Sequence, residues 1–277
     1  MRTPLVSVVI PTHNRAPLLK LAIDSVLAQT WAHMEVLVVD DNSSDGTETM
    51  IQEFDDPRIQ YMRHSADKGA AAARNTGIKA ALGSYIAFLD DDDEWEENKL
   101  EKQLMTVDDY DVILCGARLK TGKVIQRYKK ETISPRDLKR GFLFGGGTSA
   151  ILAKSDPLKN TLFDEELTRY QDWDLLIRLA SKYKIRYMSE PLLIFNAGAH
   201  DRISNAHANM PISQLEKEMR AIEKHRDFLG PFWFNYHTAK LLLAYLKLRQ
   251  RPIGHIVYTI ERCGLAPVVL VYLHRLS

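Results

Sequence analysis

The stretch Tyr85-Ile86-Ala87-Phe88-Leu89-Asp90-Asp91-Asp92-Asp93 carries an apolar run directly into four consecutive aspartates. A short, continuous apolar run of this kind is typical of a strand that is buried on both faces of a sheet. Residues 6–10 and 36–39 are two similar runs, and polar residues follow both of them. Ligands bind where the carboxyl ends of parallel strands share one edge of a sheet, so we expect the three polar clusters to meet there.

Helical patterns separate these strands. Residues 17–29 show a helical pattern, a capping-type segment at 42–45 precedes an expected helix near 47–54, and residues 69–82 form an alanine-rich helical segment. A further apolar run at 59–62 predicts another strand. Strands that alternate with helices of this length predict an α/β fold, with a mostly parallel, Rossmann-like sheet flanked by helices.

The pattern becomes mixed after the aspartates. We expect strands at residues 112–115, 124–127 and 148–152, a flexible glycine run at 145–147, and a helix that begins near Asp172. This suggests one sheet domain over residues 1–210, followed by a helical region at 211–277.

The helical region 211–277 is expected to form three helices, with breaks at residues 230–231, 251–252 and 264–267. Residues 228–277 carry six Lys or Arg and one acidic residue, interleaved with aromatic and aliphatic side chains. Cationic helices of this kind either cap a domain or make peripheral contact with a membrane, and the sequence leaves both readings open.

Composition limits the class of protein. The 277 residues, 45% of them hydrophobic and 26% charged, suffice for a sizeable core and argue against disorder.

The only cysteines, Cys115 and Cys263, fit no disulfide or zinc pattern, so we expect a reducing cytosol. The apolar run after Met1 is too short for a signal peptide, which predicts that the N-terminus is not exported. The sequence contains no basic platform and no zinc-finger spacing, so it does not indicate nucleic acid as a partner.

Four adjacent carboxylates repel one another strongly unless something neutralises them. A divalent cation does so, and Mg²⁺ or Mn²⁺ held by one or two carboxylates plus diphosphate oxygens is the usual arrangement for nucleotide substrates. Such an ion would neutralise a departing nucleoside diphosphate. The alternative is a solvated acidic turn ahead of a helix near residues 98–104.

Four motifs lie at residues 7–15, 38–47, 69–77 and 85–95. In order and spacing they resemble the motifs of the family 2 glycosyltransferases, which have a GT-A fold, and the resemblance extends from residue 4 to about 205. It implies an inverting, metal-dependent transfer of a hexose or N-acetylhexosamine from a UDP-sugar to an acceptor hydroxyl. It also implies synthesis of a cell-envelope polysaccharide such as capsule or O-antigen, on a saccharide or lipid-linked acceptor, in the cytoplasm or at the inner face of the cell membrane.

The resemblance assigns nucleotide-binding roles position by position. Thr12, His13 and Asn14 correspond to residues that line the nucleotide pocket, with His13 against the base. Asp41 corresponds to the aspartate that accepts a hydrogen bond from the base, and Arg74 to a basic contact with the nucleotide.

The aspartate cluster is assigned in the same way. In the Asp-x-Asp element, Asp91 matches a contact to the ribose and Asp92 matches the metal ligand, whereas Asp90 supports the turn. Weaker matches assign contacts with the acceptor or diphosphate to Trp95, Trp173 and His200, although large aromatic residues more often fill cores.

An inverting transfer needs a base that takes the proton of the acceptor hydroxyl, so a carboxylate must stand opposite the leaving diphosphate. The segment Gln171-Asp172-Trp173-Asp174 is similar to the family's Glu-Asp-Trp-Asp element, in which the first aspartate is the base. The resemblance therefore assigns catalysis to Asp172, and Gln171 departs from the pattern by replacing the glutamate.

Plainer readings remain open beside these roles. Asn14 could satisfy turn backbone, Arg74 could be a solvated helix residue, and Asp172 could cap a helix. A metal-dependent sugar nucleotidyltransferase is an alternative function, but the first strand is not followed by the glycine-rich loop that it predicts. A non-catalytic module that binds a sugar nucleotide is another, and it predicts loss of Asp92 or Asp172, which are both present.

Overall fold

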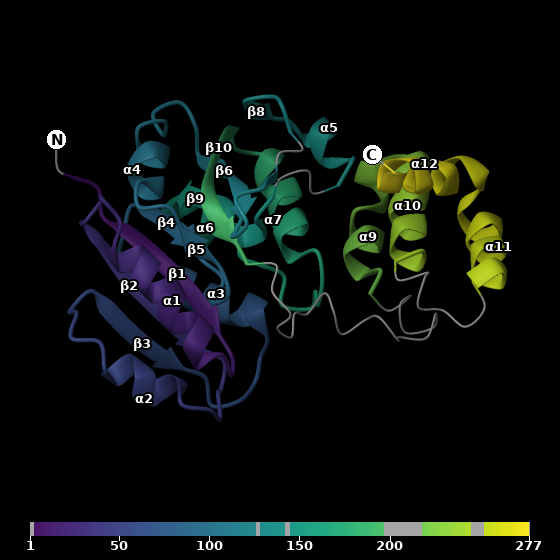
Figure 1. Ribbon diagram of the computed structural model, residues 1–277. Helices are drawn as coiled ribbons and strands as arrows, with labels where there is room; N and C mark the ends of the chain where they lie inside the picture. Colours follow the sequence, from purple (N-terminus) through teal and green to yellow (C-terminus); the bar gives the residue numbers. More distant parts are fainter. Residues whose placement is uncertain (1–2, 126–127, 142–144, 197–217, 245–251, 277) are drawn as a thin grey trace. The chain divides into compact units, whose positions relative to one another are not determined.

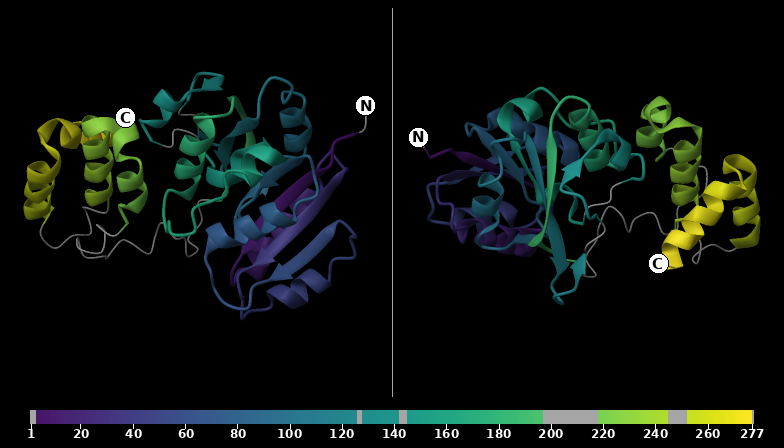
Figure 2. Two further views of the ribbon diagram at one scale, coloured as in Figure 1. Left: turned by 180° about the vertical axis from the view of Figure 1, so that it is seen from behind. Right: turned by 90° about the horizontal axis from the view of Figure 1, so that it is seen from above.

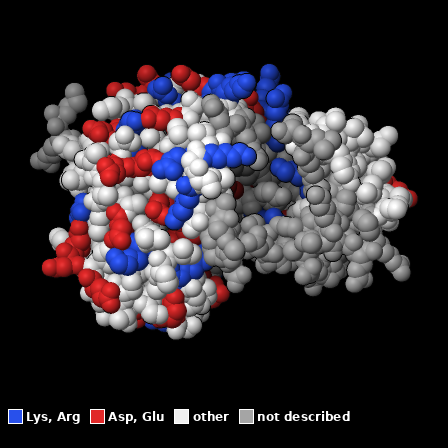
Figure 3. All heavy atoms as spheres, viewed as in Figure 1, with Lys and Arg blue, Asp and Glu red and all other residues white. Residues whose placement is uncertain are grey.

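Figure 1 shows the computed structural model of the protein, which describes residues 3–276 apart from 126–127, 142–144, 197–217 and 245–251. The chain divides into two units. Unit 1 comprises Met1–Leu138, Phe142–Glu166 and Gln171–Ala197, and unit 2 comprises Lys139–Gly141, Leu167–Tyr170 and Gly198–Ser277. Unit 1 contains the sheet, and acidic and basic side chains are interspersed over its surface (Figure 3).

The N-terminal half of the sheet is parallel. Its strands, in the spatial order β3-β2-β1-β4, are β1 (Val6–Thr12), β2 (Met34–Asp40), β3 (Ile59–Arg63) and β4 (Tyr85–Phe88). Every residue of β1 and β2 is buried, which explains why these strands read as continuous apolar runs. In the register, Thr12 pairs with Asp40 and Val9 pairs with Phe88, so the polar segments that follow these strands start at one edge.

Three helices make the crossovers of this half: α1 (Ala16–Leu27), α2 (Thr47–Gln52) and α3 (Ala70–Ala80). Pro17 stands in the first turn of α1, where a missing N–H costs nothing because the first amides of a helix have no partner inside it. Helix α3 is rich in small residues because it lies close to β1. A Cβ added to Gly77 would come within 2.3 Å of a Val9 methyl. Helices flank the sheet, as Figure 2 shows.

The other half of the sheet is mixed, as the sequence predicts. Its strands are β5 (Glu94–Trp95), β6 (Val112–Leu119), β7 (Val124–Ile125), β8 (Thr132–Ile133), β9 (Ile151–Lys154) and β10 (Ile185–Phe195). Strand β9 lies antiparallel between β4 and β6, β10 runs parallel to β6, and β5, β7 and β8 pair antiparallel at the margins. The helices here are α4 (Lys99–Leu104), α5 (Pro135–Leu138), α6 (Ser155–Lys159) and α7 (Gln171–Ala180). The α/β fold class is confirmed.

One predicted strand needs correction. The expected strand at 148–152 begins only at Ile151, and a single-turn 3₁₀ helix, Gly147–Ala150, precedes it. Gly146 and Gly147 have φ angles of 99° and 56°, a left-handed backbone that glycine adopts readily and that turns the chain ahead of the strand.

Unit 2 is helical in its C-terminal segment, as predicted. The helices among its described residues are α9 (Arg220–Lys224), α10 (Arg226–Leu242), α11 (Pro252–Cys263) and α12 (Leu265–Leu276). The expected break at residues 230–231 is present inside α10, because Gly230 has the non-helical angles φ 72° and ψ 169° just ahead of Pro231. The described residues of this segment hold four helices, not the expected three. Helices α10 to α12 share a small core of Tyr236, Ala239, Leu242, Leu243, Cys263, Val268 and Val271. Within the described part of the chain, every helix is too short or too polar to cross a membrane.

Candidate active site

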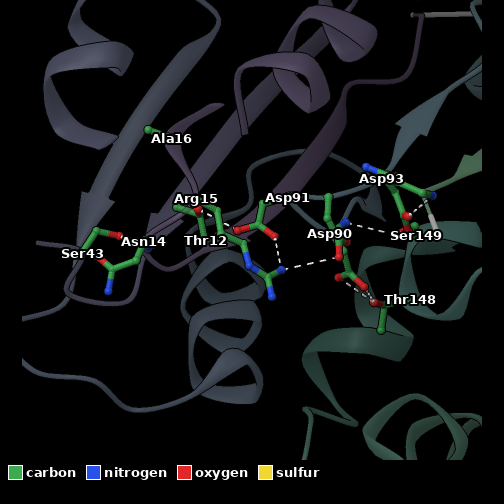
Figure 4. Close-up of polar contacts among 12 residues, drawn as sticks. Thr12, Asn14, Arg15, Ala16, Ser43, Asp90, Asp91, Asp93, Thr148 and Ser149 are labelled. Atoms are coloured by element: carbon green, nitrogen blue, oxygen red, sulfur yellow. Dashed lines mark hydrogen bonds and ion pairs between the residues drawn. The ribbon is translucent and has the colours of Figure 1, made fainter. Parts of the chain in front are cut away.

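The polar segments that follow β1, β2 and β4 meet at the carboxyl edge of the parallel strands (Figure 4). Thr12 Oγ1 donates to Asp91 Oδ2 at 2.8 Å, which joins the end of β1 to the aspartate cluster after β4. Asn14 joins β1 to the loop after β2, because its N–H donates to Ser43 Oγ at 2.8 Å and its Oδ1 accepts from the Ser44 N–H at 2.7 Å. The predicted convergence of these segments is therefore present, and Asn14 does satisfy turn backbone.

Asp91 is buried and accepts hydrogen bonds from two side chains. Besides Thr12, Arg15 donates from Nη1 to Asp91 Oδ1 at 3.0 Å, and the same nitrogen lies 3.5 Å from Asp92 Oδ2. Burial raises the pKa of Asp91 to about 6, against the opposing charge of Arg15 and the hydrogen bond from Thr12. Arg15 thus neutralises part of the negative charge of the aspartate cluster. The sequence assigns that neutralisation to a metal ion alone.

Asp90 and Asp93 are held by the segment ahead of β9. Thr148 Oγ1 donates to Asp90 Oδ1 at 2.9 Å, and Ser149 Oγ donates to Asp93 Oδ2 at 2.8 Å. Burial raises the pKa of Asp93 well above its ordinary value, and the negative charges of its neighbours in the cluster add to the rise. Asp93 is therefore a buried structural acid, distinct in role from the aspartates that remain partly exposed.

Asp90 and Asp92 are the two carboxylates of the cluster with the greatest side-chain exposure, 29% and 11%. Their oxygens suit Mn²⁺ or Mg²⁺. In the described part of the chain, no three His, Cys, Asp or Glu side chains are grouped into a ready-made metal site. A nucleotide-bound ion usually takes one or two carboxylates and completes its shell with phosphate oxygens and water, so the residues fit an ion that binds together with a diphosphate.

Arg74 links the aspartate cluster to helix α7. Its Nη2 donates to Asp90 Oδ1 at 2.6 Å and its Nη1 donates to Gln171 Oε1 at 3.0 Å. The side chain is buried, its guanidinium carbon lies 5.4 Å from the centre of the Phe163 ring, and its Nε has no hydrogen-bond partner among the described residues. The reading of Arg74 as a solvated helix residue is therefore excluded.

Asp172 lies in the first turn of α7, next to Gln171. Because Arg74 bonds both Gln171 and Asp90, Asp172 lies at the same site as Asp90. Its Oδ1 accepts from the Trp173 N–H at 2.8 Å, and its Oδ2 is 3.7 Å from the place that a Cβ on Gly147 would take. Burial raises the pKa of Asp172, although the Trp173 N–H and the charge of Arg74 oppose the rise. A carboxylate with a raised pKa is a better proton acceptor, which suits a general base.

Asp41 holds the backbone just ahead of α3. Its Oδ2 accepts from the Gly69 N–H at 2.6 Å, and its Oδ1 accepts from the Lys68 N–H at 3.0 Å and from Nδ1 of the buried His64 at 2.7 Å. Burial alone would raise the pKa of Asp41, but the hydrogen bonds from His64 and the two amides outweigh burial and lower that pKa. His13 is exposed beside it and donates from Nδ1 to the Asp41 carbonyl oxygen at 2.7 Å.

Replacing His64 by alanine is expected to lower the free energy of unfolding by about 1–3 kcal/mol, because Asp41 stays buried with one hydrogen bond fewer. Folding lowers the pKa of Asp41, so its carboxylate stabilises the protein above the ordinary Asp pKa, and this contribution is lost as the pH falls through the lowered value. His64→Ala should therefore lessen the acid sensitivity. Urea unfolding over a pH series measures both effects.

The matched control is His33→Ala at an exposed histidine, for which a change within about 0.5 kcal/mol is expected. Equal losses in the two variants would contradict the role of His64 as the support of Asp41.

The structure corrects the expectation for two tryptophans. Trp95 is 3% exposed and donates its indole N–H to the Ser149 carbonyl at 3.0 Å, and Trp173 is 2% exposed and donates to the Leu138 carbonyl at 2.8 Å. A buried indole offers no ring face on which a sugar can stack, so both residues belong to the core. His200 lies outside the described residues.

Several residues of the site carried no assigned role in the sequence. They are Arg15, His64, Thr148, Ser149 and Gln171. Each reaches a partner far away in the chain, as Arg15 does with Asp91, 76 residues on. The position of Arg15 directly after the polar cluster is a usable signal, but no local pattern specifies the contact that it makes.

The comparison with known sequences places the chain in a family. The profile described as Glycosyl transferase family 2 matches residues 7–169. A UDP-Glc:alpha-D-GlcNAc-diphosphoundecaprenol beta-1,3-glucosyltransferase of Escherichia coli is 50% identical over 100 residues, which are 36% of this chain and only 40% of that protein. WcaA of E. coli strain K12, named as a colanic acid biosynthesis glycosyl transferase, is 31% identical over 241 residues, 81% of this chain and 82% of that protein.

Solved structures agree on the fold. S. aureus TarS, in complex with UDP-GlcNAc, has a TM-score of 0.64 at 16% identity and covers 96% of this chain and 90% of its own. A mannosyltransferase of Pyrobaculum calidifontis, in complex with GDP-Man and Mn²⁺, has a TM-score of 0.63 at 19% identity and covers 99% of this chain and 80% of its own. Since the family profile spans more than half of the sequence and the fold is GT-A, the chain belongs to glycosyl transferase family 2 and is a glycosyltransferase.

Proposed function

We propose that this enzyme transfers a hexose or N-acetylhexosamine from a UDP-sugar to an acceptor hydroxyl with inversion, in the synthesis of a cell-envelope polysaccharide. The observation that carries the proposal is the bridge made by Arg74, whose two terminal nitrogens bond Asp90 of the aspartate cluster and Gln171 at the start of α7. This bridge keeps Asp172 beside the cluster. An acidic cluster and a second carboxylate with a raised pKa are what an inverting transfer needs.

In the proposed mechanism, Asp172 takes the proton of the acceptor hydroxyl as that oxygen attacks the anomeric carbon. Asp41 and His13 contact the nucleobase of the donor, and Thr12 and Asn14 shape the nucleotide pocket. Arg74 supplies positive charge to the nucleotide. Asp172 is half-buried, and this partial desolvation raises the pKa of its carboxyl group, which favours proton uptake from the acceptor.

The aspartate cluster holds the diphosphate end of the donor. Asp91 would contact the ribose, and Asp92 would hold Mn²⁺ or Mg²⁺ beside the partly exposed Asp90. When bound, the ion supplies positive charge to the diphosphate as it leaves. Arg15, which contacts both Asp91 and Asp92, fixes the orientation of the two carboxylates.

The donor and acceptor classes rest on relatives. The E. coli glucosyltransferase named above takes UDP-Glc and a GlcNAc-diphosphoundecaprenol acceptor, according to its name, and this favours a UDP donor and a lipid-linked saccharide acceptor here. A lipid-linked acceptor is also the reason to place the enzyme in the cytoplasm at the inner face of the cell membrane, with peripheral contact through residues 228–277.

A donor screen tests the proposal. We expect slow, metal-dependent hydrolysis of one UDP-hexose or UDP-N-acetylhexosamine, detected as nucleoside diphosphate release, with EDTA abolishing the reaction and Mn²⁺ or Mg²⁺ restoring it. GDP-mannose and the other GDP sugars serve as the matched comparison, since a structural relative binds GDP-Man. Preference for a GDP sugar would overturn the UDP assignment. The absence of release from every donor with either metal would overturn the catalytic proposal.

A further inference from the structure

Three successive glycines lie ahead of β9, and packing accounts for the first two. A Cβ on Gly145 would lie 2.9 Å from the Cγ2 methyl of Ile125 in β7. One on Gly146 would lie 2.1 Å from Cδ2 of Leu193 in β10. Both distances are shorter than van der Waals contact, so a side chain at either position would force the neighbouring strand to move. No ligand is needed to explain these two glycines.

Gly147, the third glycine, is not required by packing in this way. Apart from its neighbours in the chain, the only described atom within 4 Å of a Cβ built on it is Asp172 Oδ2, at 3.7 Å. Its φ of 56° lies in the left-handed region, which favours glycine but which asparagine also adopts. The described residues therefore leave the space beside Gly147 open, and that space adjoins the carboxylate that we assign as the base.

A chain of side-chain contacts fixes this glycine relative to the start of α7. Thr148, the next residue, donates from Oγ1 to Asp90 Oδ1 at 2.9 Å (Figure 4). Arg74 bonds the same Asp90 oxygen and also Gln171, the first residue of α7. The segment that carries the glycine and the helix that carries the proposed base are thus tied to one carboxylate, so the open space is a fixed feature of the site.

The oxygen that faces this space is available to an acceptor. Oδ1 of Asp172 accepts from the Trp173 N–H, and no other residue in the described part of the chain donates to Oδ2. A hydroxyl that gives its proton to a base must come within about 2.6–3.2 Å of it. When that hydroxyl sits directly on a ring carbon, the ring itself comes close to the base, whereas water brings no such bulk.

We propose that Gly147 determines which acceptor the enzyme can use. Its lack of a side chain admits a saccharide ring beside Asp172 Oδ2, so that a hydroxyl on a ring carbon meets the base. That hydroxyl gives its proton to Oδ2 and its oxygen bonds to the anomeric carbon of the donor. The bond from that carbon to the diphosphate breaks, and its electron pair leaves with UDP. This deepens the proposed function and rests on it, because it takes Asp172 as the base.

The ratio of sugar transfer to donor hydrolysis tests the proposal, since water and a saccharide compete for the same oxygen. The probes are the UDP-sugar that wild type hydrolyses and a lipid-linked GlcNAc-diphosphate acceptor, the acceptor class in the name of one relative. In Gly147→Ala this ratio should fall at least about 100-fold, because a methyl group displaces the ring from the base. Linkage analysis of the wild-type product should place the new bond on a ring-carbon hydroxyl.

The matched control is Gly122→Ala in the turn between β6 and β7. Gly122 has a φ of 86°, and a Cβ on it would meet nothing within 4 Å, so this variant carries left-handed backbone strain far from the base. It should keep the wild-type ratio, and circular dichroism checks that both variants are folded. If Gly147→Ala does not fold, Gly147→Asn replaces it, because asparagine tolerates the left-handed backbone, and the same fall is expected.

An equal ratio in Gly147→Ala and Gly122→Ala would overturn the proposal, as would an equal loss of hydrolysis and transfer in Gly147→Ala. A wild-type product linked through a primary hydroxyl would overturn it too. Failure of the proposed function looks different: wild type would then release no nucleoside diphosphate, or Asp172→Asn would transfer sugar at the wild-type rate. Either result would remove the base on which the role of Gly147 depends.

Discussion

Asp172→Asn is expected to abolish sugar transfer while donor affinity stays at the wild-type level. Loss of a general base costs about 10²–10⁴-fold in kcat. Asparagine has the same shape and its Oδ1 can still accept from the Trp173 N–H, so the start of α7 should keep its structure. Transfer kinetics give kcat, and titration calorimetry with the donor and Mn²⁺ gives the dissociation constant.

Asp174→Asn is the matched control, because it makes the same change on the same helix. Asp174 is fully buried and its Oδ2 accepts from Arg178 at 2.7 Å and 2.9 Å, so this variant should lose stability but keep its kcat. If Asp172→Asn transferred sugar at the wild-type rate, Asp172 would be removed from the role of base.

The pH dependence of the wild-type kcat gives a second test of Asp172 as the general base. The carboxylate must be ionised to accept a proton, and burial raises the pKa of Asp172. The rate should therefore fall as the pH drops through that raised pKa, at a higher pH than an exposed aspartate would allow. The profile of kcat against pH for wild type and for Asp174→Asn should show the same acid limb.

The parallel half of the sheet could be predicted from sequence because each of its elements carries a local signal. Strands β1, β2 and β4 are buried on both sides, so they read as apolar runs without alternation. The helices between them have helical spacing and end near the expected residues. In the mixed half, signals are weaker: β10 was not predicted, and the expected strand at residue 148 begins three residues later.

The site was predictable to the extent that topology gathers strand ends at one edge. Thr12, Asn14, Asp41 and Asp91 meet there because β1, β2 and β4 are parallel neighbours. Their individual roles could be assigned only from the family resemblance, and they remain predictions.

The partners of the site residues could not be predicted, because they arise from packing between distant segments. Arg74 meets Gln171, 97 residues later, and Ser149 meets Asp93 across 56 residues. Burial has the same origin: nothing local distinguishes Trp95 and Trp173, which fill the core, from aromatic residues that would stack on a sugar. The family resemblance assigns roles to Asp90, Asp91 and Asp92 but none to Asp93, and the structure adds that Asp93 is buried whereas Asp90 and Asp92 are more exposed.

Asp92→Asn is expected to remove the metal-dependent part of donor binding. Substituting even the outer partners of a metal ligand costs about 10–100-fold in metal affinity, so loss of the ligand itself should weaken donor binding in Mn²⁺ at least about 100-fold. Binding measured in EDTA should be nearly the same in the variant and in wild type. Titration calorimetry of the sugar nucleotide, with and without Mn²⁺, separates these two quantities.

Asp93→Asn makes the same change at the next residue and is the matched control. Asp93 is 2% exposed, and burial together with the charges of Asp90 and Asp92 raises its pKa against the hydrogen bonds that it accepts from Ser149 and the Asn196 N–H. Loss of its charge therefore relieves repulsion inside the cluster. This variant should keep metal-dependent binding. If Asp92→Asn kept it too, the ion would have to be held by Asp90, whose oxygens Arg74 and Thr148 already share, and Asp90→Asn would then show the loss instead. The two single-residue changes thus decide which carboxylates balance the charge of the diphosphate and which only complete the fold.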